Sequence, residues 1–205
     1  MKRVIALIST VLCAMNVMAQ NGNDDAKALI GKLSEQMRSM ENYEVSFTVV
    51  SGEQKVKGYY AVSGEKYYIS IDDAEVFCDG GARYEVNPAN KEVTVDAVDT
   101  KSHNILTNPT RAFDFVDGDF NFEMVATNAT STTIKLTPKE NNALGIIFVD
   151  MQREPVKPTA LAYEYDGQTI KIEINSLDEM TGMVDISMFT FDKNNYRGYE
   201  IVDFR

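Results

Sequence analysis

Hydrophobic and polar residues alternate along most of the chain, and a period of two predicts β-strands with one face in a core. In the run 43–49, for example, Tyr43, Val45 and Phe47 share one face, while Glu44 and Ser46 share the other. Residues typical of turns separate each run from the next. The predicted strands cover residues 43–49, 55–62, 66–71, 75–78, 82–86, 92–97, 121–126, 131–138, 144–150, 159–165 and 168–177, with shorter ones in 183–191 and 199–204.

One stretch that departs from this alternation lies before the first strand. In residues 26–40 the apolar side chains recur at intervals of three and four, which predicts an amphipathic helix. Asp24 and Asp25 at its start and Arg38 near its end suit the helix dipole. The apolar stripe of this helix consists of Ala26, Leu29, Ile30, Leu33, Met37 and Met40.

A second departure, residues 104–116, interrupts the middle of the chain. Asn108 followed by Pro109 is typical of a helix start, because Asn can cap and Pro fits the first helical position. A helix this short is not stable alone in water. We therefore predict a plug that packs inside, or across the mouth of, a curved sheet; the alternative is a connector helix on the outside. The apolar residues at or beside the helical spacing are Ala112, Phe113, Phe115 and Val116.

Together these signals predict a mainly β fold with two or three helices. About eleven strands in series favour one large antiparallel meander, and a sheet of that length must curl or split. Because the helices are too apolar to stand free, we expect an unclosed (half) antiparallel β-barrel of about eleven strands covered by a helical lid. Residues 20–205 would form this single domain.

Residues 1–19 have the features of a cleaved signal peptide. Two basic residues precede an apolar run, and Val17-Met18-Ala19 is a small-residue cleavage site. The run is too short for a membrane-spanning helix. Cys13 would be a lipidation site only after a small residue, and Leu12 is bulky. We expect export to the periplasm and a mature protein that begins at Gln20.

Charge and cysteine content narrow the function classes. The chain of 205 residues has a formal net charge of −11 at pH 7. An acidic protein without a basic cluster is a poor candidate for binding nucleic acid or an anionic membrane surface. Cys78 is the one cysteine after cleavage, so no disulfide can form within the mature chain. It alternates with Val76 and is expected to be a buried small hydrophobe.

Candidate chemistry is sparse. His103 is the only histidine, which excludes a histidine cluster, and its polar surroundings in the sequence favour a solvated loop residue. A hydrolase would need His103 buried beside a nucleophile such as Cys78. The acidic groups in 72–75 and at Asp114, Asp117 and Asp119 lack the spacing of a calcium loop and are expected in turns and solvated edges. We expect no enzymatic activity, no metal and no cofactor.

What remains is an excess of apolar and aromatic residues, with 10 Tyr, 10 Phe and 10 Met. An interior lined by two apolar helices and a concave sheet holds either side chains alone or a greasy ligand as well. Strand alternation shows which residues share a face, although a slip of one residue would reverse the face. The residues assigned to the concave wall are Phe47, Tyr60, Tyr67, Ile69, Tyr84 and Leu136. Those assigned to the plug are Ile105, Leu106, Phe113 and Phe115.

The order of several short motifs resembles that of the LolA-type outer-membrane lipoprotein carriers, over essentially the whole mature chain. They are Met40-Glu41-Asn42-Tyr43-Glu44-Val45-Ser46-Phe47-Thr48 after the first helix, Cys78-Asp79-Gly80-Gly81 with Tyr84 and Asn87-Pro88, Asn108-Pro109, Leu136-Thr137-Pro138-Lys139, and Phe189-Thr190-Phe191.

The resemblance implies an unclosed β-barrel whose helices form a lid over a hydrophobic cavity. It also implies a periplasmic carrier that takes acyl chains of lipoproteins, or related lipids, from an inner-membrane transporter to an outer-membrane acceptor. We expect a monomer that binds no nucleic acid. The alternative is a periplasmic sensor or interaction module on the same fold, which binds lipid or a protein partner without transport.

Two departures from the family pattern concern lid control and cargo. The best-studied carriers have an Arg that helps to hold the lid shut, and this sequence has Ser63-Gly64-Glu65 there. The family's aromatic lining often includes Trp, which is absent here.

Overall fold

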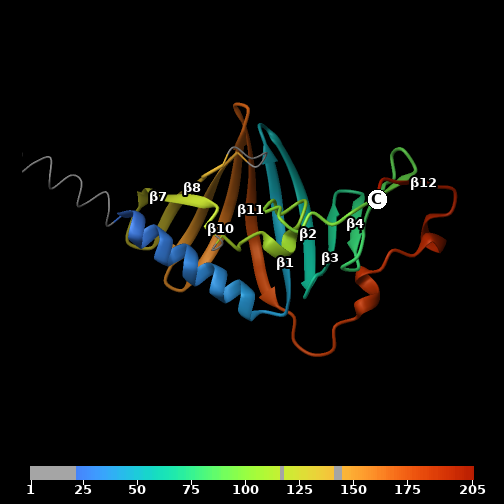
Figure 1. The fold of residues 1–205 in the computed structure, drawn as a ribbon, viewed down its shortest axis with the longest axis horizontal. Helices are drawn as coiled ribbons and strands as arrows, with labels where there is room; N and C mark the ends of the chain where they lie inside the picture. Colours follow the sequence, from blue (N-terminus) through green and yellow to red (C-terminus); the bar gives the residue numbers. More distant parts are fainter. Residues whose placement is uncertain (1–21, 116–117, 141–144) are drawn as a thin grey trace, which may run out of the picture.

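The computed structural model describes residues 22–115, 118–140 and 145–205. Within them the chain forms one α-helix over residues 22–39, three short 3₁₀ helices and twelve strands (Figure 1). No helix in this part of the chain is long and apolar enough to cross a membrane. The strands are β1 (Asn42–Ser51), β2 (Gln54–Ser63), β3 (Lys66–Ile71), β4 (Ala74–Cys78), β5 (Arg83–Asn87), β6 (Glu92–Asp96), β7 (Phe120–Thr127), β8 (Ser131–Pro138), β9 (Ile146–Arg153), β10 (Val156–Tyr165), β11 (Gln168–Glu179) and β12 (Glu200–Asp203). The 3₁₀ helices are η1 (Pro109–Arg111), η2 (Ile186–Phe189) and η3 (Lys193–Tyr196).

All twelve strands belong to one sheet, in the order β12-β6-β5-β4-β3-β2-β1-β11-β10-β9-β8-β7. Neighbouring strands are antiparallel, except that β12 runs parallel to β6. Pairing of β1 with β11 joins the two halves of the chain in the middle of the sheet. Because β7 and β12 lie at opposite edges, the sheet stays open (Figure 1). The predicted unclosed antiparallel sheet is confirmed, with twelve strands.

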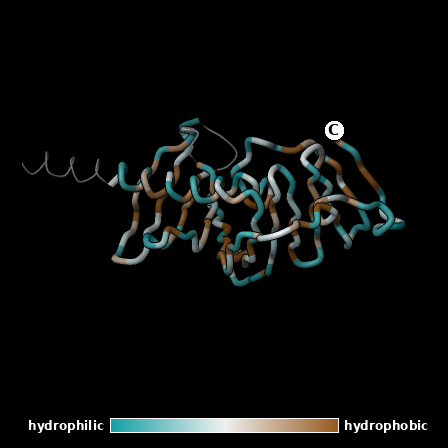
Figure 2. Tube along the Cα trace, turned by 90° about the horizontal axis from the view of Figure 1, so that it is seen from below, coloured by the Kyte–Doolittle hydropathy of each residue, from teal (hydrophilic) through white to brown (hydrophobic). Residues whose placement is uncertain are grey.

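Sequence alternation accounts for several strands directly, because β1, β3, β6, β8 and β9 bury every second residue along most of their length. In β1, Tyr43, Val45 and Phe47 are buried and the residues between them are partly exposed. The turns contain residues that accept positive φ: Asp166 and Gly167, between β10 and β11, have φ values of 50° and 72°. Figure 2 shows hydrophilic positions at the turns and hydrophobic positions along the strands.

The helix and the segment after β6 cover one face of the sheet, here called the inner face. The helix crosses in front of the half that contains β7 to β10, and the segment passes in front of β1 and β2 (Figure 1). Both bury apolar side chains with those of the strands in one large group, here called the inner cluster. From the helix this cluster receives the predicted stripe of Ala26, Leu29, Ile30, Leu33 and Met37, with Met40 packed against it.

A smaller group, here called the outer cluster, lies on the opposite face at β3 to β6. Its buried members are Phe77, Val86 and Val93. The chain that follows β11 returns across this face and contributes aromatic rings before it ends in β12 at the sheet edge. The rings packed against the buried members are Tyr68, Tyr84, Phe191, Tyr196 and Tyr199.

Two sequence predictions of secondary structure are wrong. Residues 183–191 form no strand; instead Asp185 accepts a hydrogen bond from the backbone N–H of Ser187 and begins η2. Helix formation after Asn108 stops after the single turn of η1. Pro109 occupies the first position as predicted, but the side chain of Asn108 caps nothing and donates to the carbonyl of Asp99. Val116 lies outside the described residues.

Candidate functional site beneath an inner lid

Residues 103–115, here called the lid segment, lie on the inner face and carry the predicted plug. Ile105, Phe113 and Phe115 are at most 1% exposed and belong to the inner cluster, while Leu106 is half-buried and packed against it. Phe113 and Phe115 are two residues apart and both buried. An extended chain allows this spacing on one face, whereas a helix does not. The burial of both rings explains why the helix ends early.

The predicted wall residues lie opposite the lid segment, with one exception. Phe47 from β1, Tyr60 from β2, Tyr67 and Ile69 from β3, and Leu136 from β8 are all buried members of the inner cluster. Gly58 on β2 pairs with Phe47 on β1. A Cβ atom at Gly58 would overlap the phenyl ring of Phe47, so this glycine lets the ring lie against the backbone of β2.

Tyr84 is the exception, and its assignment to the concave wall is wrong. It pairs with Phe77 on β4, whose neighbours Val76 and Cys78 belong to the inner cluster. Phe77 therefore points to the opposite face, and Tyr84 joins it in the outer cluster. Alternation correctly placed Tyr84 and Val86 on one face of β5 but did not determine which face.

Tyrosine hydroxyl groups of the sheet hold the backbone of the lid segment. Tyr43 of β1 donates to the carbonyl oxygen of Pro109 at 3.1 Å, and Tyr67 of β3 donates to that of Thr107 at 3.1 Å. Tyr163 of β10 donates to the carbonyl oxygen of His103 at 3.2 Å and accepts from the N–H of Ile105 at 3.1 Å. The lid segment is thus bonded to three strands from both halves of the sheet.

Tyr60 lies among these tyrosines, but its hydroxyl group is not hydrogen-bonded within the described residues. Its side chain is 0% exposed. Its ring packs against those of Tyr43 and Phe47, with centroid distances of 6.1 and 6.0 Å. Burial, followed by the neighbouring Tyr43 and Tyr163, raises the pKa of Tyr60 well above its ordinary value. The hydroxyl group therefore remains a protonated donor at neutral pH.

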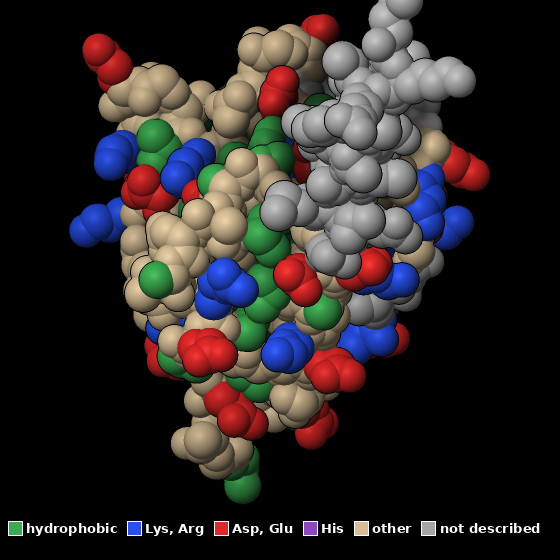
Figure 3. Space-filling view, turned by 90° about the vertical axis from the view of Figure 1, so that its left-hand side faces the viewer, with side chains coloured by type: hydrophobic (Ala, Val, Ile, Leu, Met, Phe, Trp, Pro, Cys, Tyr) green, Lys and Arg blue, Asp and Glu red, His purple; other side chains and the backbone are tan. Residues whose placement is uncertain are grey.

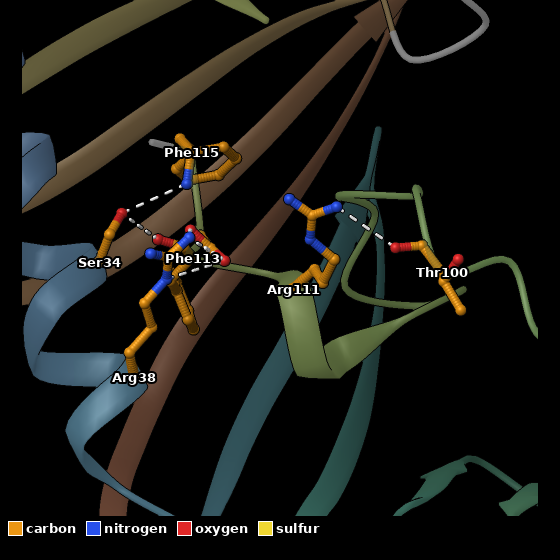
Figure 4. A network of polar contacts seen from close by, with 7 residues as sticks. Ser34, Arg38, Thr100, Arg111, Phe113 and Phe115 are labelled. Atoms are coloured by element: carbon orange, nitrogen blue, oxygen red, sulfur yellow. Dashed lines mark hydrogen bonds and ion pairs between the residues drawn. The ribbon is translucent and has the colours of Figure 1, made fainter. Parts of the chain in front are cut away.

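The helix fastens the end of the lid segment (Figure 4). The hydroxyl group of Ser34 donates to the carbonyl oxygen of Phe113 at 2.9 Å and accepts from the N–H of Phe115 at 3.2 Å. The guanidinium group of Arg38 donates three hydrogen bonds of 2.8 to 3.1 Å to the carboxylate of Asp114. Arg111 also donates to the carbonyl oxygen of Thr100 at 3.3 Å. These bonds place an ion pair at the junction of helix and lid.

Two hollows flank the lid segment along its junction with the helix. One, of about 380 Å³, lies near the start of the helix beside Ile30, Phe115 and Phe120. The other, of about 300 Å³, lies near the end of the helix between Met37, Tyr43 and Phe113. Ligand pockets for drug-sized molecules begin at about 300 Å³. A larger apolar ligand would therefore need the space that the lid segment fills.

The surface around the β7 end of the molecule has mixed charge. Figure 3 shows lysine and arginine side chains interspersed with aspartate and glutamate, with a narrow strip of hydrophobic side chains between them. The described residues on this face form no basic patch of the kind that binds polyanions.

His103 is not the solvated loop residue predicted from the sequence. It is 2% exposed, and its ring packs between those of Phe115 and Phe120 at centroid distances of 5.6 and 5.4 Å. Neither ring nitrogen makes a regular hydrogen bond, although the nearby backbone of Arg111 favours the protonated ring. Burial nevertheless lowers the pKa of His103. The sequence missed this burial because three polar neighbours, Lys101, Ser102 and Asn104, surround it in the chain.

The other candidates for chemistry are structural. Cys78 is buried, as predicted, and burial raises the pKa of its thiol. Asp114 is the lid partner of Arg38 rather than a solvated edge residue, while Asp117 lies outside the described residues. Among the described residues, no three His, Cys, Asp or Glu side chains are grouped as metal ligands would be.

Several residues of the site were not predicted from the sequence. Tyr43 and Tyr163 were within predicted strands, and a tyrosine at an inward position signals a hydroxyl group that needs a partner. Ser34 and Arg38 carried no such signal, because their partners lie far along the chain, at residues 113–115.

Comparison with solved structures supports this architecture. An uncharacterized conserved protein from Thermus thermophilus superposes with a TM-score of 0.58 and 6% identity, over 87% of this chain and 99% of its own. MucB superposes with a TM-score of 0.50 and 11% identity, over 88% of this chain and 66% of its own. This chain and these two proteins are therefore similar in fold.

A LolA superfamily protein from Nitrosomonas europaea also matches, at a TM-score of 0.44 and 9% identity, over 81% of this chain and 97% of its own. No protein-family model matches the sequence, and no curated protein sequence does so significantly. The open sheet with its inner helix and lid segment is the architecture that the sequence motifs implied.

Proposed function

We propose that this protein is a periplasmic carrier that binds acyl chains of lipoproteins, or of related lipids, beneath the lid segment. The observation that carries the proposal is the packing of Ile105, Phe113 and Phe115 against the inner face. These side chains belong to an irregular segment and not to a strand. Other apolar groups can therefore take their place without breaking the pairing of the sheet.

The energetics of acyl binding favour such an exchange. Burial of an acyl chain contributes about 0.8 kcal/mol per methylene group, so a long chain alone would contribute on the order of 10 kcal/mol. Binding that tight would prevent delivery. When the ligand displaces apolar side chains of the lid, the gain is offset by the contacts that are lost. The net affinity then reflects the difference between two similar sets of contacts, and transfer stays reversible.

The proposed carrier carries out no catalysis. A hydrolase would need a nucleophile beside His103, and the ring nitrogens of His103 have no hydrogen-bond partner among the described residues. The rings of Phe115 and Phe120 surround it instead. His103 then serves to fill the site between the lid and the sheet.

The predicted signal peptide supports a periplasmic location. In the proposed role, the protein would receive its cargo from an inner-membrane lipoprotein-releasing transporter and pass it to an outer-membrane acceptor. Lid control would depend on Arg38 of the helix, since Ser63-Gly64-Glu65 replaces the arginine that the family often uses.

A second candidate is a periplasmic sensor or interaction module that binds lipid or a protein partner without transport. The supporting observation is that the protein's own side chains already fill the space on the inner face and form the inner cluster. A protein without cargo needs no other filling.

Native mass spectrometry of the gently isolated, exported protein tests the proposal. We expect a bound lipid or lipopeptide, and displacement of a fluorescent fatty-acid probe by added acyl lipid. Truncation of the lid in Phe113→Ala should increase probe capture, whereas Phe204→Ala should not, since Phe204 is exposed at the far end of the chain. An empty protein that binds no probe and co-purifies with one protein partner would favour the second candidate.

A further inference from the structure

The tyrosine hydroxyl groups of the inner face differ from the rest of the inner cluster. Side chains such as Phe47, Ile69 and Leu136 offer only apolar surface to a ligand. Tyr43, Tyr67 and Tyr163 instead donate hydrogen bonds to backbone carbonyl oxygens of the lid segment. The sheet therefore binds the lid segment through the lid's carbonyl groups as well as through its apolar side chains.

Displacement of the lid segment would release these donors inside an apolar site. A ligand made only of hydrocarbon would leave the hydroxyl groups of Tyr43 and Tyr163 buried and unpaired and would take from Tyr67 the carbonyl oxygen that it binds. Each unpaired donor lowers the affinity by roughly tenfold. A ligand that carries carbonyl oxygens would replace the lost partners. The sheet thus selects against a plain hydrocarbon.

Tyr60 adds a donor that the lid segment does not use. It is fully buried, its hydroxyl group has no hydrogen-bond partner among the described residues, and its ring contacts that of Tyr43. Buried polar groups are nearly always hydrogen-bonded, so an unpaired one at a binding surface indicates a partner that arrives with the ligand.

We propose that Tyr43, Tyr60, Tyr67 and Tyr163 form a subsite for the carbonyl oxygens of an ester- or amide-linked acyl ligand. The lid segment occupies three of the four donors when no ligand is bound, and Tyr60 is free to bind a ligand carbonyl. This inference rests on the proposed function and names its ligand class: acyl groups joined through esters or amides, rather than alkyl chains without a carbonyl.

Tyr60→Phe is the sharpest variant, because it removes the hydroxyl group without breaking a bond of the ligand-free protein. Its matched control is Tyr59→Phe on the same strand, whose hydroxyl group donates to Glu44 at 2.8 Å on the outer side. The probes are a monoacylglycerol and the alkyl glycerol ether of equal chain length, which differ by one carbonyl oxygen. Affinities are measured by displacement of a fluorescent fatty acid.

We expect the wild type and Tyr59→Phe to bind the ester roughly three- to tenfold more tightly than the ether. In Tyr60→Phe this preference should shrink toward equal affinity, while the ligand-free protein melts no earlier than the wild type. Equal affinities for ester and ether in the wild type, or an unchanged preference in Tyr60→Phe, would overturn the carbonyl subsite and leave the carrier function standing. Binding of neither lipid by the wild type would overturn both.

Discussion

The inner and outer clusters both bury aromatic rings against the same sheet, but they are held together differently. On the outer face, Tyr84, Phe191 and Tyr196 form a continuous stack, with successive centroids 5.0 and 5.2 Å apart. The hydroxyl groups of Tyr196 and of Tyr68 both donate to the carboxylate of Glu75, each at 2.6 Å. Specific side chains meet there, and the polar groups are satisfied within the fold.

On the inner face the tyrosines donate to backbone carbonyl groups of an irregular segment, and Tyr60 is left unpaired. Any molecule with carbonyl oxygens can accept the same hydrogen bonds. Few molecules could replace both the stacked rings and the carboxylate of Glu75 in the outer cluster. The comparison indicates that the outer cluster holds the C-terminal chain on the sheet as a fixed part of the fold. In the proposed function, the inner cluster is an arrangement in which one partner, the lid segment, is exchanged for a ligand.

The largest expected effect breaks the inner cluster. Phe113→Asp would place an unpaired carboxylate against buried apolar side chains, which costs several kcal/mol in a dry site. We expect the melting temperature to fall by about 10 °C and fatty-acid capture to be disturbed. Phe204→Asp is the matched control, since Phe204 is 69% exposed and should tolerate the charge. Wild-type melting and binding of Phe113→Asp would show that the lid segment is an external connector.

A second variant tests whether the outer cluster is purely structural. Phe191→Ala removes the middle ring of the stack between Tyr84 and Tyr196. Because Phe191 is only partly buried, we expect a loss of about 2 kcal/mol, less than for a fully buried ring. Fatty-acid affinity, measured well below the melting temperature, should stay at the wild-type value. A matching loss of affinity would show that the two faces act together and that the comparison fails.

The fold was largely predictable because apolar and polar residues alternate along the strands and turn residues separate them. A period of two predicted β1 to β11 almost completely, and the Asp-Gly turn at residues 166–167 predicted the hairpin of β10 and β11. Prediction failed in residues 183–191, where the chain crosses the outer face without a strand partner. Phe189 is buried there and Phe191 packs against the outer cluster, while Met183 and Ile186 are exposed, so the spacing of these apolar residues does not report a strand.

The site was less predictable, since its contacts join distant parts of the chain. Phe113 and Phe115 were recognisable because two phenyl rings in one short segment must be buried. Tyr84 was placed on the wrong face, because alternation leaves the choice of face to the strand register. The burial of His103 depends on Phe115 and Phe120 closing over it, which no local pattern shows.

A smaller effect should follow from weakening the junction of helix and lid. Arg38→Gln removes the ion pair with Asp114, in which the arginine side chain is 52% exposed and the aspartate 16%. Solvent weakens such a pair, so we expect a stability loss of less than about 1 kcal/mol. The same change should speed probe uptake, by up to about fivefold. Lys171→Gln breaks a comparable pair with Asp150 on the strands and should leave uptake unchanged. Equal uptake rates in Arg38→Gln and Lys171→Gln would show that Arg38 does not control the lid.

A pH dependence of stability should originate at His103. Burial lowers the pKa of His103 in the folded protein; Arg111 lowers it further, while Asp114 and Asp119 act in the opposite direction. The unfolded chain takes up the proton near the ordinary histidine pKa of 6.5, so it holds more protons than the folded chain just below that pH. Stability contributed by the neutral ring is therefore complete above this value and is lost as the pH falls.

His103→Phe keeps an aromatic ring between Phe115 and Phe120 but cannot be protonated. Between about pH 7.5 and about pH 5.5, where carboxyl groups scarcely titrate, the wild type should lose up to about 4 °C more in melting temperature than this variant. Thermal melting of both proteins at the two pH values measures the difference. An equal loss in both would mean that His103 is equally easy to protonate in the folded and unfolded chains. The lid would then not shield the ring from solvent, and the inner cluster would be less dry than the contrast between the two faces requires.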